Sequence, residues 1–275
     1  MDAEKVTAPG LARRKVRGEV VTDRIVMVTA YDATFAALAD EAGVDVVLVG
    51  DSLGMVVQGV TNTLPVTLDE TVYHTRLAAR GATRALVVGD LPFGSYQVSP
   101  QQGVESSIRL IKEGAAAAVK LEGGVPMADT IEAITRVDIP VMAHIGLTPQ
   151  SFHRMGGHRV QGRSSGSQAG GRDRLLADAK AVEAAGAFSV VLEGMPRELA
   201  AEITANVSIP TIGIGAGPEC DGQVLVLHDV LGLTPNLYKF AKAYADLRSE
   251  VIGALGAYAS DVRDGTFPDD AHSFH

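Results

Sequence analysis

Short apolar runs that stop at a glycine or a charged residue recur along the chain. The run Val46–Val49 is followed directly by Gly50, Asp51 and Ser52. So short a run without polar residues predicts a β-strand buried on both faces, since a strand with one wet face alternates apolar and polar positions. Runs of the same kind end at Asp90, at Lys120 and Glu122, at His144 and at Glu193. This recurrence outweighs the simpler interpretation of each site as a turn.

Amphipathic helical patterns separate these runs. Asp32 and Ser99 are placed as N-caps of two helices, and Thr67 with Glu70 forms a capping box before a third. The predicted strands cover residues 25–30, 46–49, 85–90, 117–122, 140–145, 188–193, 210–215 and 224–228. Eight strands alternating with helices predict an α/β fold and favour a closed (β/α)₈ barrel, with a doubly wound open sheet as the alternative.

Three segments depart from the alternating pattern. Residues 1–20 are expected to form a polar arm, and residues 236–262 a C-terminal helical segment with an apolar stripe. Residues 150–171 are rich in Gly and Ser and predict a flexible loop, either a lid over the site or a disordered insertion. We therefore expect one barrel domain over residues 1–275 with these three additions.

Composition and charge narrow the classes of function. The net charge of -9 and the pI of about 5.2 disfavour nucleic acid as a partner. No apolar run approaches the roughly 20 residues of a membrane span, and the basic residues near the start precede no apolar stretch, so no secretory signal is expected. Cys220 is the only cysteine, which excludes an internal disulfide and favours a reducing, cytoplasmic location.

The carboxyl ends of barrel strands face one site, where barrel enzymes place their chemistry. The side chains expected there are Asp51, Ser52, Asp90, Lys120, Glu122, His144, Glu193 and the less certain His228. Several carboxylates in one pocket repel one another unless a cation is present, and oxygen-rich donor sets favour Mg²⁺. Lys120 would face the negative charge of an acid substrate or enolate, and Glu193 could act as a general base.

A purely structural interpretation remains open for these residues. The charged side chains could form an ion-pair network that fills the barrel mouth. His144 could donate a hydrogen bond to a ligand, or it could be a satisfied histidine at a strand end. His74 lies within a predicted helix and is expected to be structural.

Several motifs then identify a family resemblance. They are Val49–Met55, Leu64–Glu70 with His74, Gly89–Tyr96, Val119–Gly124, Ala143–Gln150, Val160–Arg163, Val191–Glu193 and Ile212–Gly217. Together they resemble the ketopantoate hydroxymethyltransferase family, in the order in which that family carries them. The resemblance extends from about Met27 to Phe240, with a departure over Ser164–Gly171, where the family segment is more often charged and helical.

The resemblance implies a (β/α)₈ TIM barrel of the phosphoenolpyruvate/pyruvate type that assembles into a homo-oligomer, usually a decamer. It implies hydroxymethyl transfer from 5,10-methylenetetrahydrofolate to 3-methyl-2-oxobutanoate through a Mg²⁺-stabilised enolate, giving 2-dehydropantoate, the first step of pantothenate biosynthesis. Matched by motif, Asp51, Asp90 and Glu122 are metal-associated, and Glu193 is the proton acceptor. The substrate contacts implied are Asp51, Ser52, Asp90, Lys120 and, with a less settled role, His144.

Two other classes of function compete with this interpretation. Phosphoenolpyruvate mutase and isocitrate lyase enzymes also use a metal-bound α-keto acid enolate in a barrel, and the lyases use a loop cysteine as acid. Cys220 does not stand at a predicted strand end, which disfavours the lyases. A non-catalytic barrel acting in assembly is disfavoured by the intact set of acidic residues.

Overall fold

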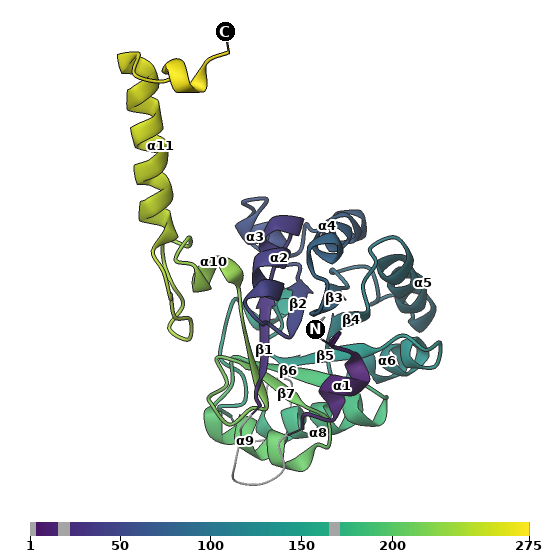
Figure 1. Ribbon diagram of the computed structural model, residues 1–275. Helices are drawn as coiled ribbons and strands as arrows, with labels where there is room; N and C mark the ends of the chain where they lie inside the picture. Colours follow the sequence, from purple (N-terminus) through teal and green to yellow (C-terminus); the bar gives the residue numbers. More distant parts are fainter. Residues whose placement is uncertain (1–3, 16–22, 165–170, 275) are drawn as a thin grey trace. The chain divides into compact units, whose positions relative to one another are not determined.

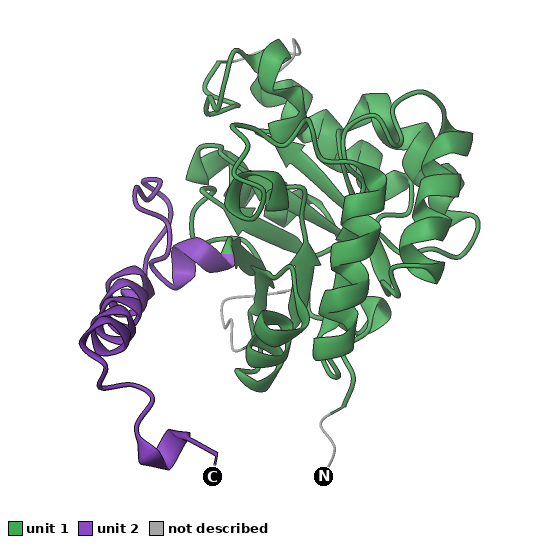
Figure 2. Cartoon of the chain, turned by 90° about the horizontal axis from the view of Figure 1, so that it is seen from above, with its two compact units in different colours: residues 1–226 green, residues 227–275 purple. Residues whose placement is uncertain are grey.

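The structure is a computed structural model that describes residues 4–15, 23–164 and 171–274. Its contacts divide the chain into two compact units, residues 1–226 and 227–275 (Figure 2). In the first unit, eight parallel strands pair in sequence order and close into a barrel (Figure 1). The strands are β1 (Ile25–Thr29), β2 (Val46–Val49), β3 (Leu86–Asp90), β4 (Ala118–Glu122), β5 (Val141–Gly146), β6 (Ser189–Glu193), β7 (Thr211–Ile214) and β8 (Gly222–Leu225). The closed barrel confirms the predicted fold and excludes the open sheet.

Helices and short turns connect the strands around the outside of the barrel (Figure 1). The α-helices of this unit are α1 (Ala8–Ala12), α2 (Ala33–Glu41), α3 (Leu53–Val56), α4 (Leu68–Gly81), α5 (Pro100–Lys112), α6 (Ala128–Thr135), α7 (Phe152–Met155), α8 (Arg172–Ala184) and α9 (Arg197–Asn206). Two 3₁₀ turns are η1 (Val125–Met127) and η2 (Pro149–Ser151). Asp32 and Ser99 cap α2 and α5, and Thr67 with Glu70 forms the complete capping box of α4, as predicted.

Alternation along each strand separates an inner core from an outer one. In β4, Ala118 belongs to the cluster inside the barrel, whereas Val119 and Leu121 pack in the cluster that the surrounding helices cover. Because side chains alternate with period two, Lys120 and Glu122 point to the barrel interior with Ala118. The position of the charged side chains inside the barrel therefore follows from the register of the apolar ones.

The last strand begins earlier than predicted. The sequence predicted a strand over 224–228, but β8 ends at Leu225, and His228 lies in α10 (Leu227–Val230) of the second unit. β8 starts at Gly222, which pairs with Ile25 of β1. A Cβ at Gly222 would lie 2.5 Å from the Ile25 carbonyl oxygen, so only a glycine permits this pairing. His228 is consequently not a strand-end residue of the barrel.

The polar arm predicted over residues 1–20 contains a buried helix. Ala8 and Leu11 of α1 pack with residues at the start of the strands, such as Ile25 and Val46, and so close the amino end of the barrel. Thr7 caps this helix by accepting a hydrogen bond from the Gly10 N–H. Residues 16–22 lie outside the described part of the chain. Two apolar residues in one helical turn were too weak a pattern to reveal this element from sequence.

The segment 150–171 begins with ordered turns. Residues 150–151 belong to η2, α7 follows directly, and residues 165–170, which include most of the predicted Gly- and Ser-rich stretch, lie outside the described residues. The prediction of a flexible lid therefore stays a prediction. Gly156 ends α7 with φ of 66°, a left-handed conformation that glycine adopts without strain.

The second unit contains α10, α11 (Leu247–Asp264) and the 3₁₀ turn η3 (Asp270–His272). The sequence predicted a helical segment over 236–262, but α11 begins only at Leu247, so Phe240 and Tyr244 precede it. The Asp246 carboxylate accepts a hydrogen bond from the Ser249 N–H and fixes this start. No helix in the described part of the chain is both long and apolar enough to cross a membrane.

Candidate active site

The charged residues predicted at the strand ends meet inside the carboxyl end of the barrel. They are Asp51, Asp90, Lys120, Glu122, His144 and Glu193. The β-sheet register pairs Asp90 with Lys120 and Glu122 with His144 on neighbouring strands. Of the six, only Glu193 is partly open, with 17% of its side chain exposed. We call these six residues the charged cluster.

Asp90 connects the two sides of the charged cluster. Its Oδ1 accepts a hydrogen bond of 2.9 Å from Lys120 Nζ, and its Oδ2 accepts one of 3.2 Å from the Asp51 backbone N–H. Lys120 Nζ also lies 4.0 Å from Glu122 Oε1. A single buried ammonium therefore stands among three carboxylates, so negative charge is in excess at this side of the site.

His144 joins two carboxylates on the other side. Its Nδ1 lies 3.4 Å from Glu122 Oε1, and its Nε2 lies 3.2 Å from Glu193 Oε2. Both are charge contacts without the alignment of a good hydrogen bond. The sequence left open whether His144 contacts a ligand or makes its hydrogen bonds within the fold. The structure places it as a bridge between the predicted base and a predicted metal-associated residue.

Gln150, at the rim of the barrel, donates hydrogen bonds to two carboxylates of the charged cluster. Its Nε2 donates to Asp51 Oδ2 at 3.0 Å and to the Leu91 carbonyl oxygen at 2.9 Å, while its backbone N–H donates to Glu122 Oε2 at 2.9 Å. Its Oε1 accepts a 2.7 Å hydrogen bond from the Tyr96 hydroxyl. Gln150 thus fixes the orientation of two acidic side chains, Asp51 through its side-chain amide and Glu122 through its backbone N–H.

Sequence reasoning missed the roles of Gln150 and Tyr96, although both stood inside quoted motifs. The available signal was their position in loops that follow predicted strands, at the carboxyl end of the barrel. A polar residue in such a loop is most often solvated, and nothing in the sequence indicates that both are buried. Their contacts depend on which loops meet, which only the closed barrel decides.

Burial and crowding of negative charge shift the protonation of the aspartates. Burial raises the pKa of Asp51 well above its usual value, and the charges of Asp90 and Glu122 raise it further. Burial also raises the pKa of Asp90, although the Lys120 ammonium opposes this. Burial opposes the charge on Lys120, but the three carboxylates outweigh it and raise the pKa of the ammonium above its usual value. Lys120 therefore stays charged.

His144 is held in its protonated form when no other ligand is bound. Burial and the charge of Lys120 oppose protonation, but contacts with Glu122 and Glu193 outweigh them and raise the pKa of His144 to about 9. Burial likewise opposes ionisation of Glu122, yet His144 and Lys120 lower the pKa of that carboxyl. The pair therefore carries opposite charges at neutral pH.

The donor set of the cluster fits a hard divalent cation. Within the described ranges no three His, Cys, Asp or Glu side chains are grouped into a metal cage, and Glu122 contacts His144 and Gln150. Mg²⁺ does not need such a cage, since one or two carboxylates with water and substrate oxygens suffice. Glu122 Oε1 is buried and has no well-aligned hydrogen bond to the described residues. Asp51 and Asp90 are thus the better candidates for direct ligands, with Glu122 nearby.

Gly50 packs closely against the side chains of the cluster. Gly50, which precedes Asp51, has no side chain there, and an added Cβ would lie 2.9 Å from Ser52 Oγ and 3.7 Å from Asp90 Oδ2. Ser52 Oγ lies 2.9 Å from the Tyr31 hydroxyl oxygen, which orients it. His74 Nδ1 lies 2.8 Å from the Tyr31 carbonyl oxygen, in line with its predicted structural role. Ser52 is therefore at the edge of the cluster, where the sequence placed it.

The fold is shared with enzymes of the PEP mutase/isocitrate lyase superfamily. A phosphonopyruvate hydrolase aligns with a TM-score of 0.60 at 13% identity, covering 98% of this chain and 92% of that one. A 2,3-dimethylmalate lyase, a member of that superfamily, aligns with a TM-score of 0.58 at 20% identity, covering 97% of this chain and 91% of that one. These similarities show that the chain has the same barrel fold as these enzymes.

Sequence comparison specifies the family within this class. The ketopantoate hydroxymethyltransferase family model matches residues 5–270. The chain is 55% identical to the 3-methyl-2-oxobutanoate hydroxymethyltransferase of Pelobacter propionicus over 99% of this chain and 98% of that protein, and 55% identical to that of Geobacter sulfurreducens over 96% of both. The chain belongs to the ketopantoate hydroxymethyltransferase family and is an enzyme of the transferase class, which confirms the resemblance inferred from its motifs.

Proposed function

We propose that the chain transfers a hydroxymethyl group from 5,10-methylenetetrahydrofolate to 3-methyl-2-oxobutanoate and so forms 2-dehydropantoate for pantothenate biosynthesis. Family membership supports the hydroxymethyl transfer. The observation that carries the proposal is the charged cluster itself: one ammonium, three buried carboxylates and a separate, partly open carboxylate, Glu193. These are the groups that an α-keto acid needs in order to lose a proton.

The first task of the site is to bind an anionic keto acid. The Lys120 ammonium is held in position by Asp90 and offers its charge to the substrate carboxylate or to the developing enolate oxygen. Ser52, at the edge of the cluster, provides a hydroxyl group for a molecule of this small size. Because the cluster is largely buried from solvent, each of these interactions is stronger than it would be in water.

Glu193 is the group proposed to remove the proton from C3 of the keto acid. Its side chain is the most open of the cluster, and His144 holds one of its oxygens at 3.2 Å. A base must lie within reach of the proton that it takes, and its other oxygen can point to the substrate while His144 fixes the first. His144 therefore acts on the reaction by orienting Glu193.

Mg²⁺ is the proposed cofactor, with Asp51 and Asp90 as ligands and Glu122 close by. When bound, the metal supplies Lewis-acid polarisation of the substrate oxygens, which is worth several kcal/mol for reactions of this kind. Gln150 keeps Asp51 and Glu122 oriented for it. The excess of buried carboxylates over the single Lys120 ammonium supports this assignment.

The overall transfer balances without an oxidant or reductant. Both bonds between the methylene carbon and the folate nitrogens break, and this carbon forms one bond to C3 of the keto acid and one to the oxygen of a water molecule. The proton from C3, taken by Glu193, and one proton from water end on the two folate nitrogens. The products are 2-dehydropantoate and tetrahydrofolate.

The lyase alternative lacks a cysteine in the right place. Cys220 is buried at the amino end of the barrel, two residues before β8, and the charged cluster lies at the opposite end. Burial raises the pKa of the Cys220 thiol to about 11, so it is a poor acid catalyst at neutral pH. This observation disfavours a mechanism that needs a loop cysteine.

Homo-oligomer assembly, with the decamer that the family resemblance implies, and a cytoplasmic location complete the proposal. Apolar side chains on α11 support self-association, because Val251, Ile252, Leu255 and Tyr258 are all exposed. Size-exclusion chromatography with light scattering of the full chain would give the number of subunits. A monomer at micromolar concentration would contradict this part of the proposal.

The central test is exchange of the C3 proton of 3-methyl-2-oxobutanoate in D₂O, followed by NMR. We expect loss of the C3–H signal with Mg²⁺, no loss with EDTA, and hydroxymethyl product only after methylenetetrahydrofolate is added. Exchange without product on addition of folate would contradict the donor. No exchange and no product under any condition would overturn the proposal and favour trials of lyase-type substrates.

A further inference from the structure

Strands β3 and β4 separate from each other beside the charged cluster. The ladder hydrogen bond nearest to the cluster runs from the Leu91 N–H to the Lys120 carbonyl oxygen, at 2.8 Å. In a regular parallel ladder the next hydrogen bond would run from the Glu122 N–H to the Leu91 carbonyl oxygen. Both of these backbone groups bond to side chains instead. The carboxyl ends of the two strands are therefore joined through side chains at the point where the acidic residues stand.

Tyr96 and Gln150 supply these side chains, and both are buried. The Tyr96 hydroxyl oxygen accepts a hydrogen bond of 3.1 Å from the Glu122 N–H, and Gln150 Nε2 donates to the Leu91 carbonyl oxygen at 2.9 Å. The two side chains also bond to each other, because the Tyr96 hydroxyl donates to Gln150 Oε1 at 2.7 Å. A continuous path of hydrogen bonds thus replaces the missing bond of the ladder.

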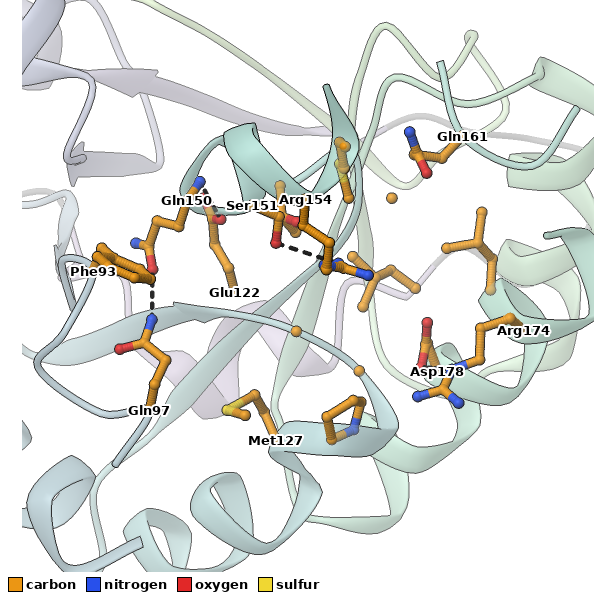
Figure 3. Close-up of a pocket in the computed structure, with 18 of the residues that line it drawn as sticks. Phe93, Gln97, Glu122, Met127, Gln150, Ser151, Arg154, Gln161, Arg174 and Asp178 are labelled. Atoms are coloured by element: carbon orange, nitrogen blue, oxygen red, sulfur yellow. Dashed lines mark hydrogen bonds and ion pairs between the residues drawn. The ribbon is translucent and has the colours of Figure 1, made fainter. Parts of the chain in front are cut away.

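The Gln150 amide has a partner at each of its hydrogen-bonding positions. Its Nε2 donates one proton to the Leu91 carbonyl oxygen and the other to Asp51 Oδ2 at 3.0 Å. Its Oε1 accepts from the Tyr96 hydroxyl and, at 3.1 Å, from Gln97 Nε2, which points at it in Figure 3. A reversed amide would turn its oxygen toward two acceptors, one of them the Asp51 carboxylate. The donors that face Oε1 therefore decide which way the amide points.

Of these two donors, Tyr96 holds the amide more closely. Its contact with Gln150 Oε1 is the shorter one, and it is buried, whereas Gln97 is half-buried. The Tyr96 hydroxyl also lies 2.9 Å from the Glu122 carbonyl oxygen, so its single proton has two acceptors within reach. The acceptor at the shorter distance is Gln150 Oε1.

We propose that Tyr96 is a positioning residue of the active site, whose hydroxyl turns the Gln150 amide so that an N–H group faces Asp51. This inference rests on the proposed function, in which Asp51 is a ligand of Mg²⁺. Tyr96 acts on this ligand through two hydrogen bonds in series, the first to Gln150 and the second from Gln150 to Asp51. Supporting hydrogen bonds of this kind typically change metal affinity by about 10- to 100-fold.

The test measures the affinity for Mn²⁺, used in place of Mg²⁺, by electron paramagnetic resonance of the full-length protein. Tyr96→Phe keeps the aromatic ring in the core and removes only the hydroxyl, so we expect about 10-fold weaker binding. Gln97→Leu removes the longer hydrogen bond to Oε1 and should weaken binding by about threefold. Tyr73→Phe is the matched control, because Tyr73 is half-exposed on α4. Its affinity should equal that of wild type.

A double variant separates positioning from a general loosening of the fold. If Tyr96 acts through Gln150, then Tyr96→Phe combined with Gln150→Leu should bind Mn²⁺ as weakly as Gln150→Leu alone, within about twofold. Losses of affinity that multiply in the double variant would overturn the inference. An affinity of Tyr96→Phe within about twofold of wild type would also overturn it.

Failure of the proposed function would be seen separately, as wild-type protein that binds no Mn²⁺ and exchanges no C3 proton. Hydrogen–deuterium exchange of the metal-free protein, followed by mass spectrometry, then still tests the role of Tyr96. The Gln150 backbone N–H donates to Glu122 Oε2, and a released Gln150 side chain should loosen this segment. Faster exchange of the peptide that contains Gln150 in Tyr96→Phe supports the inference, and exchange equal to wild type overturns it.

Discussion

The two ends of the barrel each bury a lysine–aspartate pair, but the pairs differ in what surrounds them. At the amino end, Lys15 Nζ donates to Asp221 Oδ2 at 2.8 Å and to the Thr204 carbonyl oxygen at 2.6 Å. The same Asp221 oxygen accepts hydrogen bonds from the backbone N–H and hydroxyl of Thr211. At the carboxyl end, Lys120 pairs with Asp90 in the presence of two further carboxylates.

The difference shows how charge balance distinguishes a structural ion pair from a reactive one. At the amino end one buried aspartate faces one lysine and accepts further hydrogen bonds from Thr211. The cluster at the carboxyl end carries excess negative charge, and one buried Glu122 oxygen has no aligned hydrogen-bond partner among the described residues. Buried charges without full compensation reduce stability, and proteins retain them where a ligand completes the site.

The largest effect is expected from removal of the proposed base. Glu193→Gln keeps the shape of the side chain but removes its ability to accept a proton, so C3 exchange should slow by as much as about 10⁴-fold. The thermal midpoint should change little, because Glu193 is the most open member of the cluster. Exchange by NMR and calorimetric unfolding measure the two quantities. Exchange within tenfold of wild type would assign the base elsewhere.

Substitution in the Lys15–Asp221 pair at the amino end should lower stability and leave activity unchanged, the opposite of Glu193→Gln. Lys15→Met removes the ammonium that faces the buried Asp221 carboxylate and should lower the free energy of unfolding by about 3 kcal/mol. Turnover per folded molecule should be unchanged. Urea unfolding monitored by circular dichroism gives the loss, and the double variant with Asp221→Asn should recover part of it. A Lys15→Met protein with full stability and impaired turnover would contradict the distinction between the two ends.

Substitution of Gln150 should have an effect of intermediate size, on metal affinity. Gln150→Leu removes the amide that orients Asp51, and loss of such a supporting hydrogen bond typically lowers metal affinity by about 10- to 100-fold. Binding of Mn²⁺ as a Mg²⁺ substitute, followed by electron paramagnetic resonance, measures this without relying on turnover. Gln101→Leu is the control, since the Gln101 side chain donates to Glu105 on the surface of α5. Equal Mn²⁺ affinity in both variants would exclude the positioning role.

The smallest expected effect is the pH dependence of stability in the metal-free protein. The pKa of His144 is raised from 6.5 to about 9, so its contribution is fully present below pH 6.5 and is lost as pH rises through 9. In that window stability should fall by about 1 kcal/mol per pH unit. His144→Gln should flatten this slope, whereas substitution of the exposed His153 should not. Equal slopes for wild type and His144→Gln would show that another group titrates.

The sequence by itself determined the barrel, the family and the identity of the charged cluster. Each apolar run is short and largely buried, and each ends at the same edge of a parallel sheet. The positions of Asp51, Asp90 and Glu193 therefore followed from pattern alone. Alternation within Ala118–Glu122 also fixed which side chains point inward, because the strand period is two.

Only the tertiary structure decided which residues touch across the barrel mouth. Gln150 reaches Asp51 because the loop after β5 folds over the end of β2, and no local pattern specifies that meeting. The buried α1 and the early start of β8 were likewise missed, since they depend on packing and on the close approach of Gly222 to Ile25. Periodicity is a local property of the chain, whereas contacts between loops and the balance of buried charge arise only when distant segments close the barrel.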